Sequence, residues 1–245
     1  MAPMRVVLLV AAGLAALSSL PAQADVTGRY AFSNTDRETG PPVELSMTVE
    51  VSDTGNFRLH LPGVPFYVLS MAGQIYLVSS AGSETQVMRA EDVNIALLEY
   101  TRAQGTGDLT LLEDLESRFS WKEVGPTTQA GWDGVSFALT FDDGPATQAP
   151  MLAVSDDPRI RPLAKPFIEV QTSFGRLLTI VPPGSKAIFE RGAPLQIMFL
   201  KLVETNFAPI DESRFAIPVK PMTLDELRSS RALFPNTEVL DAPGE

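Results

Sequence analysis

The residues with the clearest chemical potential are two adjacent carboxylates, Asp142 and Asp143, which follow an alternating strand pattern. Carboxylates in such a position can act as a general base or ligate a metal ion. A catalytic zinc, however, typically needs about three protein ligands. The chain contains a single histidine, His60, and no cysteine. Asp143 therefore lacks the two imidazole ligands, and any thiolate ligand, with which to build a zinc site.

The segment Leu139–Pro145, Leu-Thr-Phe-Asp-Asp-Gly-Pro, resembles the first signature of the polysaccharide deacetylases. The resemblance implies that Asp142 is the base and that Asp143 binds a divalent metal with two histidines from a later His-x-x-x-His segment. His60 lies upstream of the motif, and no histidine follows it. Phe-Asp-Asp-Gly-Pro is also ordinary turn chemistry. A metal-dependent esterase is therefore a distant third hypothesis, and no catalytic residue, metal ligand or cofactor is assigned.

The other polar candidates favour structural roles. His60 lies among the polar side chains of its strand, so we expect a solvated imidazole rather than a member of a Ser-His-Asp triad. Asp156 and Asp157 could bind calcium, and Glu113 with Asp114 could join a glycosidase-like pair, but adjacent side chains point apart. Solvated turns and helix caps explain these carboxylates. The sequence also lacks a nucleophile elbow, a phosphate loop and a dinucleotide fingerprint, so we expect a protein that is not an enzyme.

The first 24 residues have the organisation of a secretory signal peptide. Arg5 precedes an apolar run from Val6 to Leu17, and Ala22-Gln23-Ala24 matches the small-x-small cleavage pattern. The run is too short for a membrane-spanning helix, and no second apolar stretch approaches that length. We expect cleavage near Ala24 and a periplasmic or secreted product that is not an integral membrane protein.

Composition limits the partners of the exported chain. Removal of residues 1–24 takes away one basic residue, so 18 basic and 30 acidic side chains remain and the formal charge is −12. Nucleic acid is excluded as a partner because phosphate binding needs clustered Lys and Arg. The absence of cysteine excludes thiol catalysis, Cys-ligated metal and lipid attachment at an N-terminal cysteine.

Alternation of apolar and polar residues predicts a mainly β (α+β) fold built on an antiparallel meander. Residues 126–132 are expected to form a loop, and residues 195–203, which are apolar on both faces, a central strand covered on each side. The predicted strands cover residues 43–51, 57–61, 66–71, 74–79, 84–89, 118–123, 134–141, 151–154, 195–203 and 215–217.

Helical signals are fewer. Thr223 and Glu226 form a capping box for a helix that reaches about Leu233. Pro162 and Pro166 predict a kinked or two-piece helical segment after Asp157-Pro158. Further helices are expected over residues 91–104 and 108–116, the segment 172–193 receives no assignment, and residues 236–245 are expected to form a flexible tail.

Aromatic residues are concentrated in the strands and could line a ligand pocket, provided that the sheet is concave. The alternative is that they fill a β core, as most strand aromatics do. The candidate ligand-binding residues are Phe57, Tyr67, Trp121, Phe137 and Phe141.

The order of elements, together with Gly192-Ala193-Pro194-Leu195 and Phe215-Ala216-Ile217-Pro218, resembles uncharacterised periplasmic relatives of the outer-membrane lipoprotein carriers (LolA/LolB type). This resemblance implies a single domain over residues 25–235, formed by a curved antiparallel half-barrel with covering helices. It also implies that an apolar cavity beneath a lid holds acyl chains without covalent chemistry.

Two hypotheses follow. The first is an exported, non-catalytic protein that binds a hydrophobic ligand, either a lipid or a lipoprotein acyl chain, in the half-barrel. The second is an envelope protein-interaction scaffold whose core is filled and whose outer surface binds another protein. A carrier predicts a cavity lined by strand aromatic and aliphatic residues and helices that can move, whereas a scaffold predicts a filled core and an exposed apolar patch.

Overall fold

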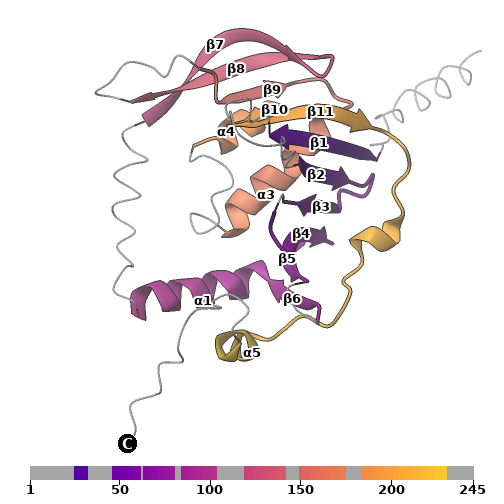
Figure 1. Ribbon diagram of the computed structural model, residues 1–245, viewed down its shortest axis with the longest axis vertical. Helices are drawn as coiled ribbons and strands as arrows, with labels where there is room; N and C mark the ends of the chain where they lie inside the picture. Colours follow the sequence, from indigo (N-terminus) through magenta and orange to yellow (C-terminus); the bar gives the residue numbers. More distant parts are fainter. Residues whose placement is uncertain are drawn as a thin grey trace, which may run out of the picture.

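The computed structural model describes residues 25–32, 46–61, 63–80, 84–103, 119–141, 149–174 and 184–230. Its strands form one antiparallel sheet of 11 strands in the order β6-β5-β4-β3-β2-β1-β11-β10-β9-β8-β7 (Figure 1). The predicted signal peptide, the helix over 108–116, the pair Asp142-Asp143 and the tail over 236–245 lie outside the described residues.

The first six strands form the meander that the alternating pattern predicts. Its turns follow local chemistry: Ala72 and Gly73 between β4 and β5 both have positive φ, 51° and 78°, as a type I′ hairpin requires. The sequence analysis did not predict β1, in which Gly28 weakens the strand signal. The strands are β1 (Val26–Phe32), β2 (Ser46–Val51), β3 (Phe57–His60), β4 (Phe66–Met71), β5 (Gln74–Ser79) and β6 (Gln86–Arg89).

The remaining strands are β7 (Phe119–Gln129), β8 (Trp132–Phe141), β9 (Leu152–Ser155), β10 (Ala193–Ile197) and β11 (Leu200–Asn206). Two predictions are wrong here. Residues 126–132 are not a loop, because β7 and β8 pair as far as Gln129 and Trp132 and turn at Ala130-Gly131, with φ of 52° and 81°. Residues 195–203 are not one strand, since the chain reverses at Met198, with φ 52°.

Neither edge strand of the sheet is a regular, fully open strand. At the β6 edge, the backbone N–H of Met222 donates to the Val87 carbonyl oxygen at 2.8 Å, so a later segment covers this strand. At the β7 edge, a bulge lies between Glu123 and Gly125, and Pro126 lacks an N–H. Bulges and proline are common devices against edge-to-edge pairing.

The curvature divides the buried side chains into two clusters. We call the larger one the concave cluster: it joins strand residues such as Tyr30, Val49 and Leu59 to the helices inside the curve (Figure 1). The smaller convex cluster lies on the opposite face of β4–β6. It contains Leu69, Tyr76, Val78, Val87 and Phe215, with Tyr67, Ile210 and Ile217 packed against it.

The helical segments lie at both faces. The helix α1 (Ala90–Ala103) follows β6 directly. The predicted two-piece segment is the short helix η1 (Arg161–Ala164) followed by α3 (Lys165–Phe174), and α4 (Lys186–Phe189) lies in the stretch that received no assignment. The strand predicted over 215–217 is wrong, because residues Glu212–Phe215 form the short helix η2.

We call residues 207–230 the strap. The strap leaves β11, follows the outside of the curved sheet and ends in α5 (Leu224–Ser229), beside α1 (Figure 1). The predicted capping box at Thr223 and Glu226 is confirmed.

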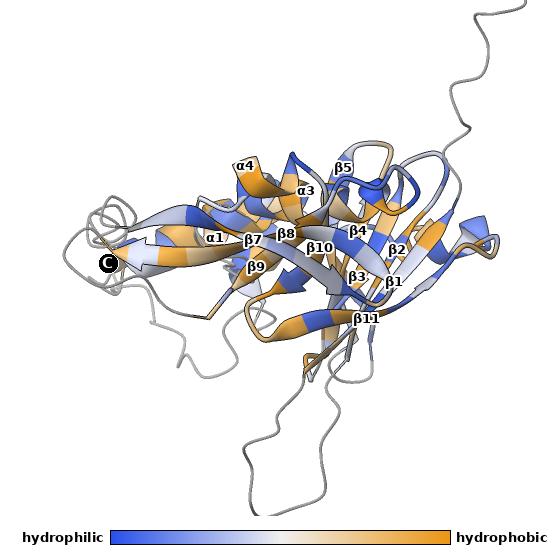
Figure 2. Ribbon diagram, turned by 90° about the horizontal axis from the view of Figure 1, so that it is seen from above, coloured by the Kyte–Doolittle hydropathy of each residue, from blue (hydrophilic) through white to orange (hydrophobic). Residues whose placement is uncertain are grey.

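The fold class is as predicted: a mainly β, open, curved antiparallel half-barrel with covering helices. Seen from above, α3 and α4 lie on one side of β8–β10 (Figure 2). Within the described part of the chain, no helix combines the length and the apolar character needed to cross a membrane.

Candidate ligand-binding groove

A helical lid covers the concave face of the sheet. We define the lid as η1, α3 and α4. The sequence favours this arrangement because Phe167, Val170 and Phe174 recur at helical spacing and are all buried. Pro162 and Pro166 stand in the first turns of η1 and α3, where a missing N–H costs little. The lid therefore presents a continuous apolar stripe to the sheet.

The lid packs closely on β1. The absence of a side chain at Gly28 makes room for Leu163, whose Cδ1 lies 2.9 Å from the position that a Cβ would occupy there. The Tyr30 ring meets Phe167 edge-on, with centroids 5.9 Å apart, and Phe167 lies 5.7 Å from Phe189. These aromatic contacts fill the space between the lid and the concave face, which we call the groove.

Tyr30 carries the one polar atom of this aromatic group. Its hydroxyl donates to the Pro194 carbonyl oxygen at 2.9 Å, so the buried O–H is satisfied. Burial raises the pKa of Tyr30 well above its ordinary value of 10.0. The phenol is therefore neutral at every physiological pH, and the groove floor beneath the lid carries no charge at this position.

Polar contacts hold the lid at its margins. Lys165 and Glu169 form an ion pair at 2.9 Å along one side of α3, and the Ser70 hydroxyl donates to Glu169 at 3.4 Å. At the C-terminal end of α3, the Asn94 side-chain amide of α1 donates to the Ser173 carbonyl oxygen. The Asn94 Oδ1 is buried and has no hydrogen-bond partner among the described residues.

The five predicted ligand-binding residues do not share one environment. Phe57 and Phe137 are buried in the concave cluster, and Trp121 packs against it. Phe141 is 42% exposed near the end of β8. Tyr67 lies on the opposite face, against the convex cluster, with Arg58 stacked 4.1 Å from its ring centroid. The sheet thus places Phe57, Trp121 and Phe137 on the groove side and Tyr67 outside it.

The residues at the centre of the groove are ones that the sequence analysis did not select: Tyr30, Phe167, Phe174 and Phe189. A signal for two of them was present, because Phe167 and Phe174 are seven residues apart and Val170 lies between them. Tyr30 lies on a strand that was not predicted. Phe189 lies in a stretch without clear periodicity.

The alternative polar candidates are dispersed. His60 ends β3 with an exposed side chain, as expected. Asp157 lies four residues before the lid, where Arg159 donates to it from the side chain and the backbone and holds the pKa of its carboxyl below the usual range. Among the residues that the structure describes, no group of three or more His, Cys, Asp or Glu is arranged to hold a metal ion.

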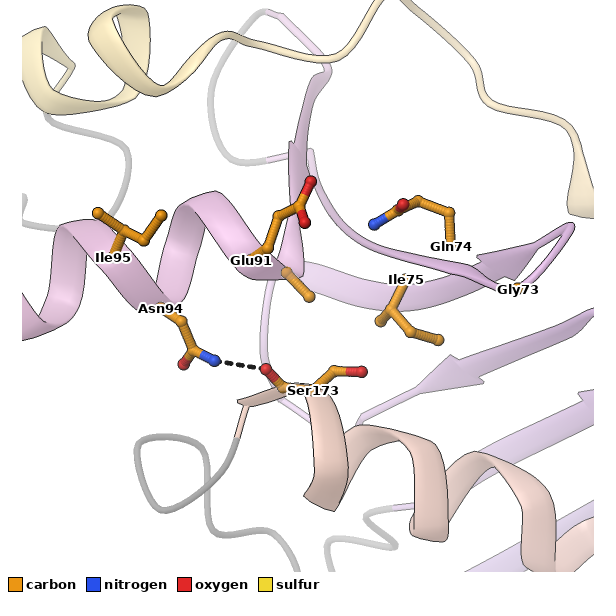
Figure 3. Close-up of a pocket in the computed structure, with 8 residues that line it drawn as sticks. Gly73, Gln74, Ile75, Glu91, Asn94, Ile95 and Ser173 are labelled. Carbon is orange, nitrogen blue, oxygen red and sulfur yellow. Dashed lines mark hydrogen bonds between the residues drawn. The ribbon is translucent and has the colours of Figure 1, made fainter.

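Three open clefts border the lid region. A cleft of about 320 Å³ lies between α3 and α4 and includes Ile168 and Phe189. A second cleft of about 400 Å³ lies beside Trp132, whose ring is stacked on Arg159, and is lined by Asp133, Asp156 and Asp157. A third, of about 340 Å³, lies where α1 meets β5 and the end of α3 (Figure 3).

Comparisons with known proteins give one structural likeness. Neither a protein-family model nor a curated protein matches the chain. The solved crystal structure of MucB is similar at 15% sequence identity with a TM-score of 0.33, over 80% of this chain and 58% of MucB. The chain therefore spans little more than half the length of MucB. At this TM-score the likeness carries no functional conclusion.

Proposed function

We propose that this chain is an exported, non-catalytic periplasmic protein that binds one apolar chain of a lipid or lipoprotein in the groove beneath the lid. The observation that carries the proposal is the cover of the concave face. The lid, rather than a second sheet, covers the apolar strands, and the side chains that η1 and α3 bury against them include Leu163, Phe167, Val170 and Phe174.

The free energy lost when the lid side chains leave the groove is similar to the free energy gained when an acyl chain is buried in their place. Withdrawal of four inward side chains from the groove costs about 1.5–3 kcal/mol each, hence about 6–12 kcal/mol in total. Burial of a sixteen-carbon acyl chain contributes about 0.8 kcal/mol for each methylene, or about 12 kcal/mol. An acyl chain can therefore replace the lid residues without a large net cost, and binding needs no covalent step or charged contact.

The groove also suits an uncharged occupant. The described strand residues beneath the lid are mostly aliphatic and aromatic, and the Tyr30 hydroxyl is already bonded to Pro194. A charge placed there would remain unpaired at a cost of several kcal/mol. The signal-like segment over residues 1–24 supports export, and the groove would then be loaded outside the cytoplasm.

A second candidate is the envelope protein-interaction scaffold, and one observation favours it. In the structure the lid side chains fill the concave cluster, while Phe199, in the β10–β11 turn, is 60% exposed with its ring 5.7 Å from Phe32. An exposed aromatic side chain at a hairpin turn, packed on the partly buried Phe32, is a common kind of protein contact. The two candidates differ in whether the lid must open.

A disulfide that locks the lid tests this difference. The chain has no cysteine, so Asn94→Cys with Ser173→Cys introduces a pair that can react only with itself. Binding of a fluorescent fatty-acid analogue, and native mass spectrometry for a co-purified lipid, are compared in the oxidised and reduced states. Each single-cysteine variant is the control.

We expect the reduced double variant to bind the probe and the oxidised one to lose at least tenfold in affinity, because a fixed α3 blocks the groove. Thiol titration verifies that the disulfide has formed. Equal binding in both states would exclude a groove beneath α3. Absence of binding in the wild type and in every variant would favour the scaffold.

A further inference from the structure

The cleft of about 340 Å³ at α1, which we call the α1 cleft, has a chemical character different from that of the groove. It lies between the β4–β5 turn, the first turns of α1 and the last turn of α3 (Figure 3). Its side-chain lining combines three polar types, amide, carboxylate and hydroxyl, with two isoleucines. The lining side chains are Gln74, Ile75, Glu91, Asn94, Ile95 and Ser173.

The α1 cleft is continuous with the concave cluster. Ile75 and Ala90 line the cleft and are also buried members of that cluster, at 4% and 2% exposure. Asn94, which forms one wall, bonds to the end of α3. A displacement of α3 therefore opens the groove directly into this cleft.

The polar side-chain atoms at the cleft include the acceptor oxygens of Glu91 and Asn94, while Gln74 contributes an amide and Ser173 a hydroxyl, each of which can both donate and accept. The Asn94 Nδ2 is already used by the Ser173 carbonyl oxygen, and the Asn94 Oδ1 has no hydrogen-bond partner within the described residues. A buried acceptor without a donor costs about 1–3 kcal/mol. Movement of α3 would expose this acceptor to whatever enters the cleft.

The charge at the cleft is negative. Glu91 is the one ionisable side chain among the lining residues, and Asp92 stands beside it in the first turn of α1. These two carboxylates already occupy the end of the helix dipole that would otherwise attract an anion. A second anion in the cleft would be repelled.

We infer that the α1 cleft receives the polar head group of an amphiphile whose acyl chain occupies the groove, and that it selects neutral or cationic head groups with O–H or N–H donors over carboxylate head groups. The inference rests on the proposed function. It adds that Glu91 determines specificity by its charge, and that the donors of the head group meet the acceptors of Glu91 and Asn94.

The test compares two ligands with the same acyl chain, 1-monopalmitoylglycerol and palmitate, at pH 7. Each ligand displaces a fluorescent fatty-acid analogue from the mature wild-type protein, from Glu91→Gln and from Glu212→Gln. Glu212 is exposed in η2, on the strap, so its substitution removes the same charge away from the cleft. The Gln variants retain the size of the side chain.

We expect the wild type to bind monopalmitoylglycerol about fivefold more tightly than palmitate. Repulsion between the Glu91 carboxylate and the palmitate carboxylate, partly screened by solvent and salt, is of about this size. Glu91→Gln should reduce this preference to about one, mainly through tighter binding of palmitate. Glu212→Gln should retain the wild-type preference. The preference should also decrease as salt concentration rises.

The outcomes separate the two claims. Binding of both ligands with equal affinity, unchanged in Glu91→Gln, overturns the head-group site but leaves the groove in place. An equal change in Glu91→Gln and Glu212→Gln also overturns it, because the effect would then come from net charge. If neither ligand displaces the probe from the wild type, the proposed groove itself is wrong and the head-group site is lost with it.

Discussion

The concave and convex faces of the sheet are covered in different ways. On the convex face, the strap is fixed by directional contacts as well as by burial. Asp25 accepts the Ile210 backbone N–H at 2.6 Å and the Asp53 N–H at 2.8 Å, so one carboxylate joins the strap to the β2–β3 turn. Arg214 pairs at 2.7 Å with Glu50, whose side chain is 11% exposed.

On the concave face, the lid meets the sheet mainly through side chains such as Leu163 and Phe167, which pack on Gly28 and Tyr30. Apolar contacts are non-directional, so another apolar body can replace them at similar free energy. Hydrogen-bonded anchors cannot be exchanged in this way, because each broken bond leaves a group to be satisfied. The comparison indicates that the lid is the displaceable cover and the strap the permanent one.

The largest expected effect is a difference in ligand affinity between two variants, Phe167→Ala in the lid and Phe215→Ala in the strap. Both side chains are buried, so each substitution should lower the free energy of unfolding by about 3–5 kcal/mol. Phe167→Ala destabilises only the closed lid, and it should therefore tighten binding of monopalmitoylglycerol, by up to about a hundredfold. Phe215→Ala destabilises the free and bound states alike and should leave affinity unchanged.

Urea unfolding and ligand titration on the same two variants provide the measurements. If Phe167→Ala weakens binding, Phe167 contacts the ligand or the lid does not open, and the assignment of the lid as the exchangeable cover fails. A change of affinity in Phe215→Ala would show that the strap also moves on binding.

An ion pair on each face provides the second comparison. Arg214→Ala leaves the mostly buried Glu50 carboxylate without its partner, and we expect a loss of about 1–3 kcal/mol in unfolding free energy. Lys165→Ala removes the pair with Glu169, in which the side chains are 36% and 30% exposed, and should cost less than about 1 kcal/mol. Equal losses measured by urea unfolding would contradict the view that the ion pair of the strap contributes more to stability than the ion pair of the lid.

The sequence predicted those elements whose signal is local. The strands over 66–71 and 74–79 have the predicted bounds, and the Thr223–Glu226 capping box forms as expected. An Ala-Gly pair turns the chain both at Ala72-Gly73 and at Ala130-Gly131. The second turn was missed because residues 126–132 were interpreted as a loop, whereas the structure accommodates Pro126 in an edge strand next to a bulge.

The groove was harder to predict because its partners are distant in sequence. Tyr30 and Phe167 touch across more than a hundred residues, and neither spacing nor composition brings them together. The reversal at Met198 lacks glycine and proline, so an uninterrupted apolar run was interpreted as one strand. The strand that contains Tyr67 was predicted correctly, and its side chains alternate between the two faces of the sheet. Only the curvature of the folded sheet shows that the face with Tyr67 is the convex one.

A smaller effect concerns the end of the strap. In the capping box, the Thr223 hydroxyl accepts the Glu226 N–H at 3.3 Å. Thr223→Ala should therefore cost about 1 kcal/mol, and Thr223→Ser should retain most of that stability. Thermal unfolding followed by circular dichroism compares the three proteins. Because the substitution leaves the lid residues unchanged, palmitoyl-ligand affinity should remain the same in all of them.

The smallest effect is the pH dependence of the contact between α5 and α1. Arg228 donates to both Glu99 oxygens, at 2.6 and 2.9 Å, and these bonds lower the pKa of Glu99 below its ordinary value of 4.5. A lowered pKa in the folded state stabilises the protein fully above pH 4.5, and this contribution is lost as pH falls from there through the folded pKa. Glu99→Gln should thus have a lower Tm than the wild type at pH 7 and an equal Tm near pH 2.

A lid variant, Phe167→Ala, is the comparison for the pH dependence of the Tm. The lid contacts at Phe167 and Phe174 are apolar, and protonation does not alter them. Phe167→Ala should therefore lower the Tm at both pH values, whereas the deficit of Glu99→Gln should disappear in acid. A Glu99→Gln deficit of the same size at both pH values would show that the side chain acts through packing. In that case α5 would be held by apolar contacts such as those of Leu227, and the distinction between an anchored strap and an exchangeable lid would not extend to the α5 end of the strap.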